Sequence, residues 1–146
     1  MNFCKVIVHT DDYGNTGIMP VFKTKGAACA DVAIPARTPI LAHSTAKIDL
    51  LISFDIPEGY KVVMYPRSSL LVKLGIMQPV SIIDSDYKGH VHVPLHNLTN
   101  NTIFLEKGER VAQIECVPAP GADTFENVTV ENAERDQNGF GGTGRI

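Results

Sequence analysis

The chain has 146 residues, 44% of them hydrophobic and 20% charged, which suits one globular domain with a single core. Its formal net charge of −3 lacks the strong positive field that nucleic acid or an anionic membrane would require. The sequence has no run near about 18 apolar residues and no secretory signal, so we expect a cytoplasmic protein that contacts neither nucleic acid nor membrane.

Short β-branched or aromatic runs, separated by proline, glycine and asparagine, predict strands along most of the chain. Many short strands with frequent turn signals favour an all-β sandwich or barrel over a helix bundle. Pro94 lies inside one of the runs and favours an edge or a bulge there. In chain order, the expected strands are Phe3–Val8, Ile48–Phe54, Tyr60–Tyr65, Val80–Ile83, Val91–Leu95, Thr102–Leu105 and Val111–Val117.

One short helix is expected from about Ser69 to Leu74, because Gly75 supplies a stop signal. Arg67, Ser68 and Ser69 stand at its start. A guanidinium fork beside a helix N-terminus suits phosphate oxygens, while one of the serines could equally cap the helix. Gln113 lies in an otherwise apolar strand, where it is either a satisfied core amide or a binding group.

The stretch from Ile82 to Gly89 places two carboxylates and an aromatic ring at the end of a predicted strand. On strand periodicity, Asp84 and Asp86 share one face, about 6–7 Å apart. A carboxylate held there beside Tyr87 suits acid–base chemistry on a flat substrate. Aspartate, serine and glycine are also ordinary hairpin-loop residues, so both interpretations stay open at this point.

The histidines and cysteines carry weaker signals. His90 and His92 share a strand face, but no third metal ligand has suitable spacing. The three cysteines are Cys4, Cys29 and Cys116, and they show no zinc-binding spacing, so reduced thiols are expected.

The C-terminal stretch differs in composition from the rest. Residues 118–121 resemble a linker, and the glycine-rich end lacks the apolar side chains needed for a core. We therefore expect a β-domain over residues 1–120 and a flexible arm over residues 121–146. Such an end is often only disordered, but Phe140 could stack on a base, and the backbone around Gly141 and Thr143 could cradle phosphate.

Five segments, in order and over nearly the whole chain, resemble the trimeric all-β deoxyuridine triphosphate nucleotidohydrolases (dUTPases). The resemblance implies a distorted jelly roll or β-sandwich of the β-clip kind, with one short helix and a flexible C-terminal tail. It also implies a homotrimer with three shared active sites, in which the tail closes over a neighbour's site. The five segments are 28–32, 66–75, 80–89, 108–113 and 135–144.

The implied activity is the Mg²⁺-dependent hydrolysis of dUTP to dUMP and pyrophosphate, which limits uracil in DNA and supplies dUMP for thymidylate synthesis. Asp84 matches the base that activates the water attacking the α-phosphate. Tyr87 matches the ring that packs on the deoxyribose and leaves no room for a 2′-hydroxyl. The backbone around Ile82 and Ile83 would read the uracil edge, with the amide of Gln78 near the base.

The same resemblance assigns groups to the metal and the phosphates. Asp31 would hold Mg²⁺ through water, and one carboxylate suffices because Mg²⁺ keeps several waters. Arg135 would reach the γ-phosphate, and Phe140 would cover the uracil. Phosphate contacts would come from Arg67, Ser68, Ser69 and Gln113, and from Gly141 and Thr143 in the tail.

The chain departs from the family pattern where Cys29, Ser69, Ser81, Asp136, Asn138 and Gly142 stand. Gly142 replaces a serine hydroxyl, so we expect an active enzyme with weaker closure over the triphosphate. Two alternatives stay open. A dCTP deaminase of similar fold needs a catalytic glutamate, where this chain offers Asp84 and Asp86. A regulatory module would use the nucleotide as a switch to engage a protein partner.

Overall fold

The structure is a computed structural model that describes residues 3–127 and 145–146. Strands dominate it, and the all-β prediction is confirmed. Within the described residues, no helix is long and apolar enough to cross a membrane. The elements are β1 (Lys5–Val8), β2 (Ala30–Ala33), β3 (Thr38–Ile40), β4 (Thr45–Asp49), β5 (Ile52–Asp55), β6 (Tyr60–Pro66), α1 (Ser68–Leu74), β7 (Ile76–Met77), β8 (Ser81–Ile83), β9 (His92–Asn97), β10 (Ile103–Leu105), β11 (Arg110–Pro118) and the 3-10 helix η1 (Ala122–Thr124).

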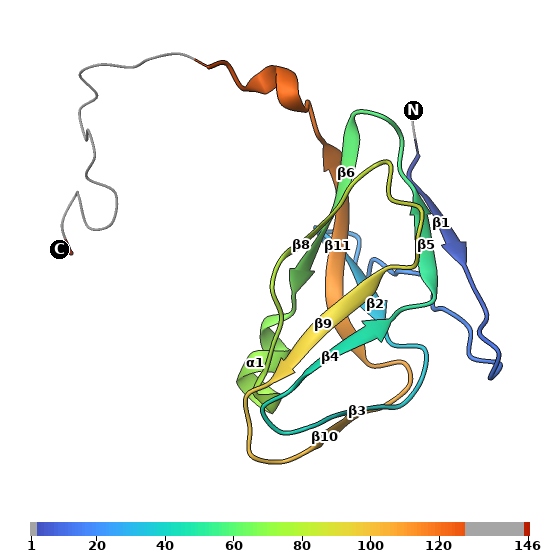
Figure 1. Ribbon diagram of the computed structural model, residues 1–146, viewed down its shortest axis with the longest axis vertical. Coiled ribbons are helices and arrows are strands. Elements are labelled where there is room, and N and C mark those ends of the chain that lie inside the picture. Colours follow the sequence, from blue (N-terminus) through green and yellow to red (C-terminus); the bar gives the residue numbers. More distant parts are fainter. Residues whose placement is uncertain (1–2, 128–144) are drawn as a thin grey trace.

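The strands form antiparallel sheets that pack around one core. A four-stranded sheet has the order β2-β11-β6-β8, and a three-stranded sheet has the order β4-β9-β7. Two further pairs are β1-β5 and β10-β3. In Figure 1, β4 and β9 cross in front of β11. Apolar side chains from both larger sheets belong to one buried cluster, among them Val32, Met64, Ile114, Ile48, Val93 and Leu95.

The expected strand over residues 48–54 is wrong as a single element, because the chain bends at Leu51. Leu51 has φ of 52°, in the left-handed region, and is buried. The Asp49 carboxylate accepts a hydrogen bond from the Leu51 N–H at 2.8 Å, which stabilises this bend. As a result β4 pairs with β9, whereas β5 pairs with β1.

The helix prediction is confirmed, with a start one residue earlier than expected. Gly75 has φ of 69° and donates its N–H to the Leu71 carbonyl at 3.0 Å, so it ends α1 as predicted. Of the two alternatives left open for Ser68 and Ser69, capping of the helix is not observed. The N-cap residue is Arg67, and within the described chain no side chain caps this helix end.

Strand β9 is the middle strand of its sheet, although Pro94 favours an edge. Only the part of β9 around Pro94 is left unpaired on one side. The N–H groups of Val91 and Asn97 donate to Ile52 and Ser44, on the β4–β5 side. By alternation, the Pro94 nitrogen faces the opposite side. There, β7 pairs with Asn97 and His96 and ends before reaching Pro94. The proline therefore removes no hydrogen bond from the sheet.

Strands β2, β3 and β7 were not expected from the sequence. They are two to four residues long, and their pairing partners β11, β10 and β9 lie far along the chain. At the other end of the protein, β11 continues into η1, which leads away from the body in Figure 1.

Candidate functional site

The first cluster of predicted site residues surrounds a cavity of about 260 Å³ at the end of β8. We call it the β8 cavity. Ile83 is buried, and Asp84 and Tyr87 follow it in the chain as exposed residues of the wall. The remaining wall comes from β4, β6 and β9, so the cavity lies where both larger sheets meet. It is lined by Lys47, Met64, Ser81, Ile82, Ile83, Asp84, Tyr87, His90, Val91 and His92.

The expected shared strand face of Asp84 and Asp86 is wrong. β8 ends at Ile83, and the Tyr87 N–H donates to the Asp84 carbonyl at 3.1 Å, which closes a turn over residues 84–87. The connection is also not a paired hairpin, because β8 pairs with β6 while β9 pairs with β4 and β7. Asp84 lines the β8 cavity, and Asp86 does not belong to its lining.

The Tyr87 ring lies folded back over the loop that leads into β9. Its hydroxyl donates to the His90 carbonyl at 2.7 Å. Gly89 makes room for the ring, because a Cβ at this position would lie 2.7 Å from the Tyr87 hydroxyl oxygen. Tyr87 is 44% exposed and lines the β8 cavity, where its ring offers an apolar face.

The second cluster joins predicted phosphate- and metal-binding residues at the other end of the four-stranded sheet. Asp31 of β2 lies between two guanidinium groups, with Arg110 Nη1 3.1 Å from Oδ2 and Arg67 Nε 3.6 Å from Oδ1. Arg67 also donates to the Arg110 carbonyl at 2.9 Å. We call Asp31, Arg67, Arg110 and Gln113 the guanidinium cluster.

The pairing of β11 explains why these residues meet. Gln113 of β11 lies opposite Asp31 on β2 and opposite Tyr65 on β6. The Gln113 amide donates to the Pro66 carbonyl at 3.0 Å. Pro66 directly precedes Arg67 in the chain, so this contact holds Gln113 near Arg67. Gln113 is half-buried, so it is neither a fully buried core amide nor free of protein contacts.

The guanidinium cluster has an excess of positive charge and borders an open surface cavity. Two guanidinium groups face one carboxylate, and Arg67 and Arg110 line a cavity of about 440 Å³ together with Ser69 and Lys73. Such an arrangement suits a polyphosphate, because guanidinium forks match phosphate oxygens. Arg110 was not among the predicted site residues. The sequence could have indicated Arg110 as a site residue, because it follows the turn at Gly108 and starts the strand that carries Gln113.

The two clusters lie at opposite ends of β6. Ile83 pairs with Val62 near the start of β6, and Arg67 directly follows the last residue of this strand. At about 3.3 Å per residue, the five steps from Val62 to Arg67 span about 16 Å. A ligand that contacts both clusters within one chain would have to span this separation.

The remaining predicted site residues have varied positions. Gln78 is 7% exposed and does not line the β8 cavity, and within the described residues neither polar atom of its side chain has a hydrogen-bond partner. Ser68 is the exposed first residue of α1. Arg135, Phe140, Gly141 and Thr143 lie outside the described residues, as do Asp136, Asn138 and Gly142.

Comparison with known proteins links this fold to one family. The family model for dUTPase matches residues 15–144. A deoxyuridine 5'-triphosphate nucleotidohydrolase from Hydrogenobaculum sp. is 33% identical over 129 residues, which cover 86% of this chain and 90% of that protein.

Two solved structures share the fold. The Staphylococcus bacteriophage 80alpha dUTPase with dUPNHPP has a TM-score of 0.82 at 24% identity, over 99% of this chain and 100% of that one. Its description states that phage dUTPases control transfer of virulence genes by a proto-oncogenic G protein-like mechanism. A dUTPase variant from phage phi11 of S. aureus, described for the coordination of a structural Mg(II) ion, has a TM-score of 0.71 at 18% identity over 91% of this chain and 97% of that one.

Proposed function

Because this chain belongs to the dUTPase family and hydrolyses dUTP to dUMP and pyrophosphate, we propose that Asp84 is the base of this reaction. The observation that carries the proposal is that Asp84 and Tyr87 stand together on the wall of the β8 cavity. Asp84 would orient the water that attacks the α-phosphate and accept its proton. The uracil would lie along the backbone of Ile82 and Ile83, with Gln78 near the base and the sugar against Tyr87.

The triphosphate would bind to the guanidinium cluster. It carries a charge of roughly −4, which this mildly acidic chain can offset only with local cations. Arg67 and Arg110 supply two guanidinium forks beside Ser69, and we assign Ser68 and Gln113 to the same phosphate chain. Positioning and charge stabilisation then carry the phosphoryl chemistry, with no covalent intermediate required.

The donors present at Asp31 fit a Mg²⁺ ion that is bound mainly by the substrate. Among residues 3–127 and 145–146, no group of three histidine, cysteine, aspartate or glutamate side chains could hold a metal. Asp31 is a single carboxylate beside phosphate-binding guanidinium groups, which suits an outer contact through water. When bound, Mg²⁺ would neutralise charge on the phosphates.

Removal of Mg²⁺ gives a direct test of this role. EDTA should abolish pyrophosphate release while leaving the Tm of the free protein unchanged, because residues 3–127 and 145–146 offer no cluster of side chains that would hold a metal without substrate. Added Mg²⁺ should restore activity. A Tm that falls on chelation would show that a metal stabilises the fold itself and would contradict a substrate-bound ion.

The separation of the two clusters supports a homotrimer with shared active sites, since another subunit can supply the half that one chain lacks. We propose that residues 121–146 form an arm beyond the β-domain of residues 1–120. In this arm, Arg135, Phe140, Gly141 and Thr143 would close over a neighbour's site. The three free thiols fit a cytoplasmic protein.

The role of Asp84 is tested by Asp84→Asn, with Asp86→Asn as the matched control. Loss of the base should lower kcat by at least about 10²-fold, whereas the control should keep nearly full turnover. The measurement is pyrophosphate release from dUTP, compared with dTTP, dCTP and UTP. Near-normal turnover in Asp84→Asn would remove Asp84 from this role, and ammonia release from dCTP would favour the deaminase alternative.

A pull-down with and without dUTP tests the alternative in which the nucleotide acts as a switch to engage a protein partner.

A further inference from the structure

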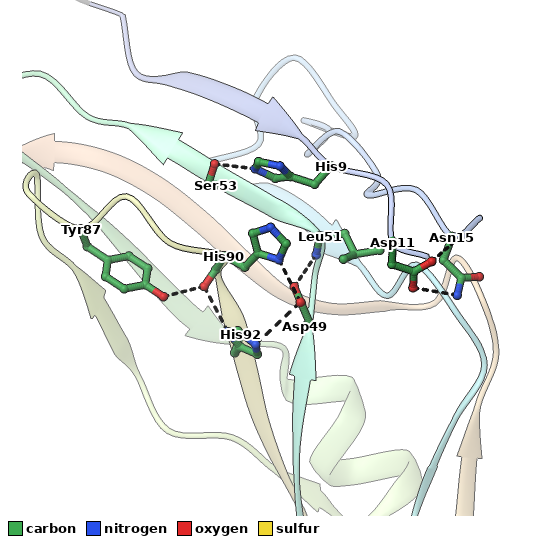
Figure 2. Close-up of polar contacts among 9 residues, drawn as sticks. All are labelled: His9, Asp11, Asn15, Asp49, Leu51, Ser53, Tyr87, His90 and His92. Atoms are coloured by element: carbon green, nitrogen blue, oxygen red, sulfur yellow. Dashed lines mark hydrogen bonds and ion pairs between the residues drawn. The ribbon is translucent and has the colours of Figure 1, made fainter. Parts of the chain in front are cut away.

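His90 connects the Tyr87 ring to the bend between β4 and β5. Figure 2 shows this arrangement. The His90 carbonyl accepts hydrogen bonds from the Tyr87 hydroxyl at 2.7 Å and from His92 Nδ1 at 3.1 Å. The His90 ring uses Nδ1 to contact Asp49 Oδ2 at 2.9 Å. Backbone and ring of one residue therefore link two separate parts of the molecule.

Asp49 is a fixed acceptor for this contact. Its Oδ1 accepts the Leu51 N–H at 2.8 Å, and Oδ2 also lies 3.8 Å from His92 Nε2. Burial alone would raise the pKa of Asp49, but the His90 hydrogen bond, the Leu51 N–H and the nearby histidines outweigh it and lower this pKa. The carboxylate is therefore ionised at neutral pH, and the left-handed Leu51 fixes its position.

These contacts require a hydrogen on Nδ1 of both rings. A carbonyl oxygen only accepts, so His92 Nδ1 must carry the hydrogen that contacts the His90 carbonyl. An ionised carboxylate likewise requires a hydrogen on His90 Nδ1. On its other side the His90 ring stacks on His9, with ring centroids 4.4 Å apart, and His9 Nε2 is held by Ser53 Oγ at 2.8 Å. The His90 ring is thus held on two sides.

We propose that His90, anchored by Asp49, is a positioning residue that fixes the Tyr87 ring against the β8 cavity. The Tyr87 hydroxyl has its partner on the His90 backbone, and Gly89 leaves the space that the ring occupies. Because Tyr87 also donates its N–H to the Asp84 carbonyl, the anchor extends to the turn that carries Asp84. This inference rests on the proposed function of Tyr87 as the ring that packs on the sugar.

The consequence is substrate discrimination at the sugar. A ring excludes a 2′-hydroxyl only if it cannot move aside, and small displacements in a site change rates strongly. An unanchored His90 would let the Tyr87 ring move toward solvent. UTP would then be accepted more readily relative to dUTP, while the fold around the β8 cavity would be kept.

The first test reads ring positions by NMR on the full-length protein. Long-range proton–nitrogen spectra should show a hydrogen on Nδ1 of His90 and of His92. Asp49→Asn should change the His90 tautomer, because the new amide group can donate toward Nδ1. The Tyr87 ring signals should shift in His90→Ala and stay in place in His90→Asn, whose amide nitrogen can replace Nδ1. His96→Ala is the matched control, since His96 lies on β9, beyond the loop that carries His90, and contacts Thr45 instead.

The second test measures kcat/KM for dUTP and UTP in the same variants. In His90→Ala the preference for dUTP should fall about tenfold, His90→Asn should restore it, and His96→Ala should leave it unchanged. Asp49→Ala, which removes the contact with His90 Nδ1, provides the same measurement if His90→Ala fails to fold. Unmoved Tyr87 signals in folded His90→Ala or Asp49→Ala would overturn the proposal.

A Tyr87→Ala arm separates this inference from the proposed function on which it rests. If Tyr87→Ala loses the dUTP preference and folded His90→Ala keeps it, His90 does not position the ring for discrimination and the inference is wrong. If Tyr87→Ala itself keeps the preference, the sugar role of Tyr87 has failed. Shifted Tyr87 signals in His90→Ala would then still support the anchor.

Discussion

At the scale of single residues, Cys4 has the clearest electrostatic prediction. Its thiol lines one cavity with Cys116, and burial, followed by the contact with Cys116, raises the pKa of Cys4 to about 12. The thiolate is the nucleophile in alkylation. At about pH 8, Cys4 in the folded protein should therefore react with iodoacetamide about 10³-fold more slowly than an unperturbed thiol. Peptide mapping over a time course measures this rate.

Unfolded protein is the control, since all three cysteines should then react at similar rates. Equal labelling of Cys4 in folded and unfolded protein would contradict the raised pKa.

The raised pKa of Cys4 also determines how the stability of the protein changes with pH. The folded state holds the Cys4 proton more tightly, so this contribution is complete below the unfolded pKa of about 9 and is lost as the pH rises toward about 12. Cys4→Ala should remove that part of the alkaline destabilisation.

At the scale of elements, the segment over residues 9–17 packs closely on the bend at Leu51. The His9 N–H donates to the Leu51 carbonyl at 2.9 Å, and Gly17 donates to the His9 carbonyl at 3.0 Å. A Cβ on Gly17 would lie 2.1 Å from the Leu51 oxygen, and backbone atoms cannot move aside cheaply. Gly17→Ala should therefore destabilise the protein by about 1–3 kcal/mol.

Urea unfolding monitored by circular dichroism measures this change. Gly26→Ala is the control, because a Cβ there meets no atom within 4 Å among the described residues. A near-neutral Gly17→Ala would show that the 9–17 segment can lift away from Leu51 without cost. His9, which stacks on His90, would then be a weaker support for the Asp49 anchor than the structure indicates.

The same bend shows where element prediction from this sequence stops. β6 and β11 were predictable because runs rich in β-branched and aromatic residues between turn signals indicate strands. The break at Leu51 has no glycine, proline or asparagine to mark it, and the local contact that stabilises it comes from the Asp49 side chain, two residues earlier. Asp84 and Asp86 looked equivalent for a related reason. Alternation assumes a continuing strand, whereas the turn after Ile83 separates the two carboxylates.

At the scale of the whole molecule, the sequence predicted polar groups for the proposed site but not how they are distributed in space. Arg67, Gln113 and Asp31 are far apart in the chain and become neighbours only through the pairing of β11 with both β2 and β6. No local pattern states that Asp84 lies at the opposite end of β6 from Arg67. This separation is the basis of the proposal that a complete site needs more than one subunit.

Subunit mixing tests that arrangement. Asp84→Asn and Arg67→Gln should each be nearly inactive as pure proteins, since each removes one half of every site. After subunit exchange at equal ratio, a site is intact when its Asp84 comes from an Arg67→Gln chain and its Arg67 from an Asp84→Asn chain. In random trimers this happens in about a quarter of the sites. Pyrophosphate release should therefore recover to about a quarter of the wild-type value.

The matched control is the same two proteins combined without exchange, which should stay inactive. Exchange itself is checked with two affinity tags that must co-purify. If mixed trimers form and remain inactive, Asp84 and Arg67 act within one chain, and the sheet would have to rearrange to close the gap along β6. Recovery of activity would instead place the two clusters on different subunits, because neither variant carries an intact pair of its own.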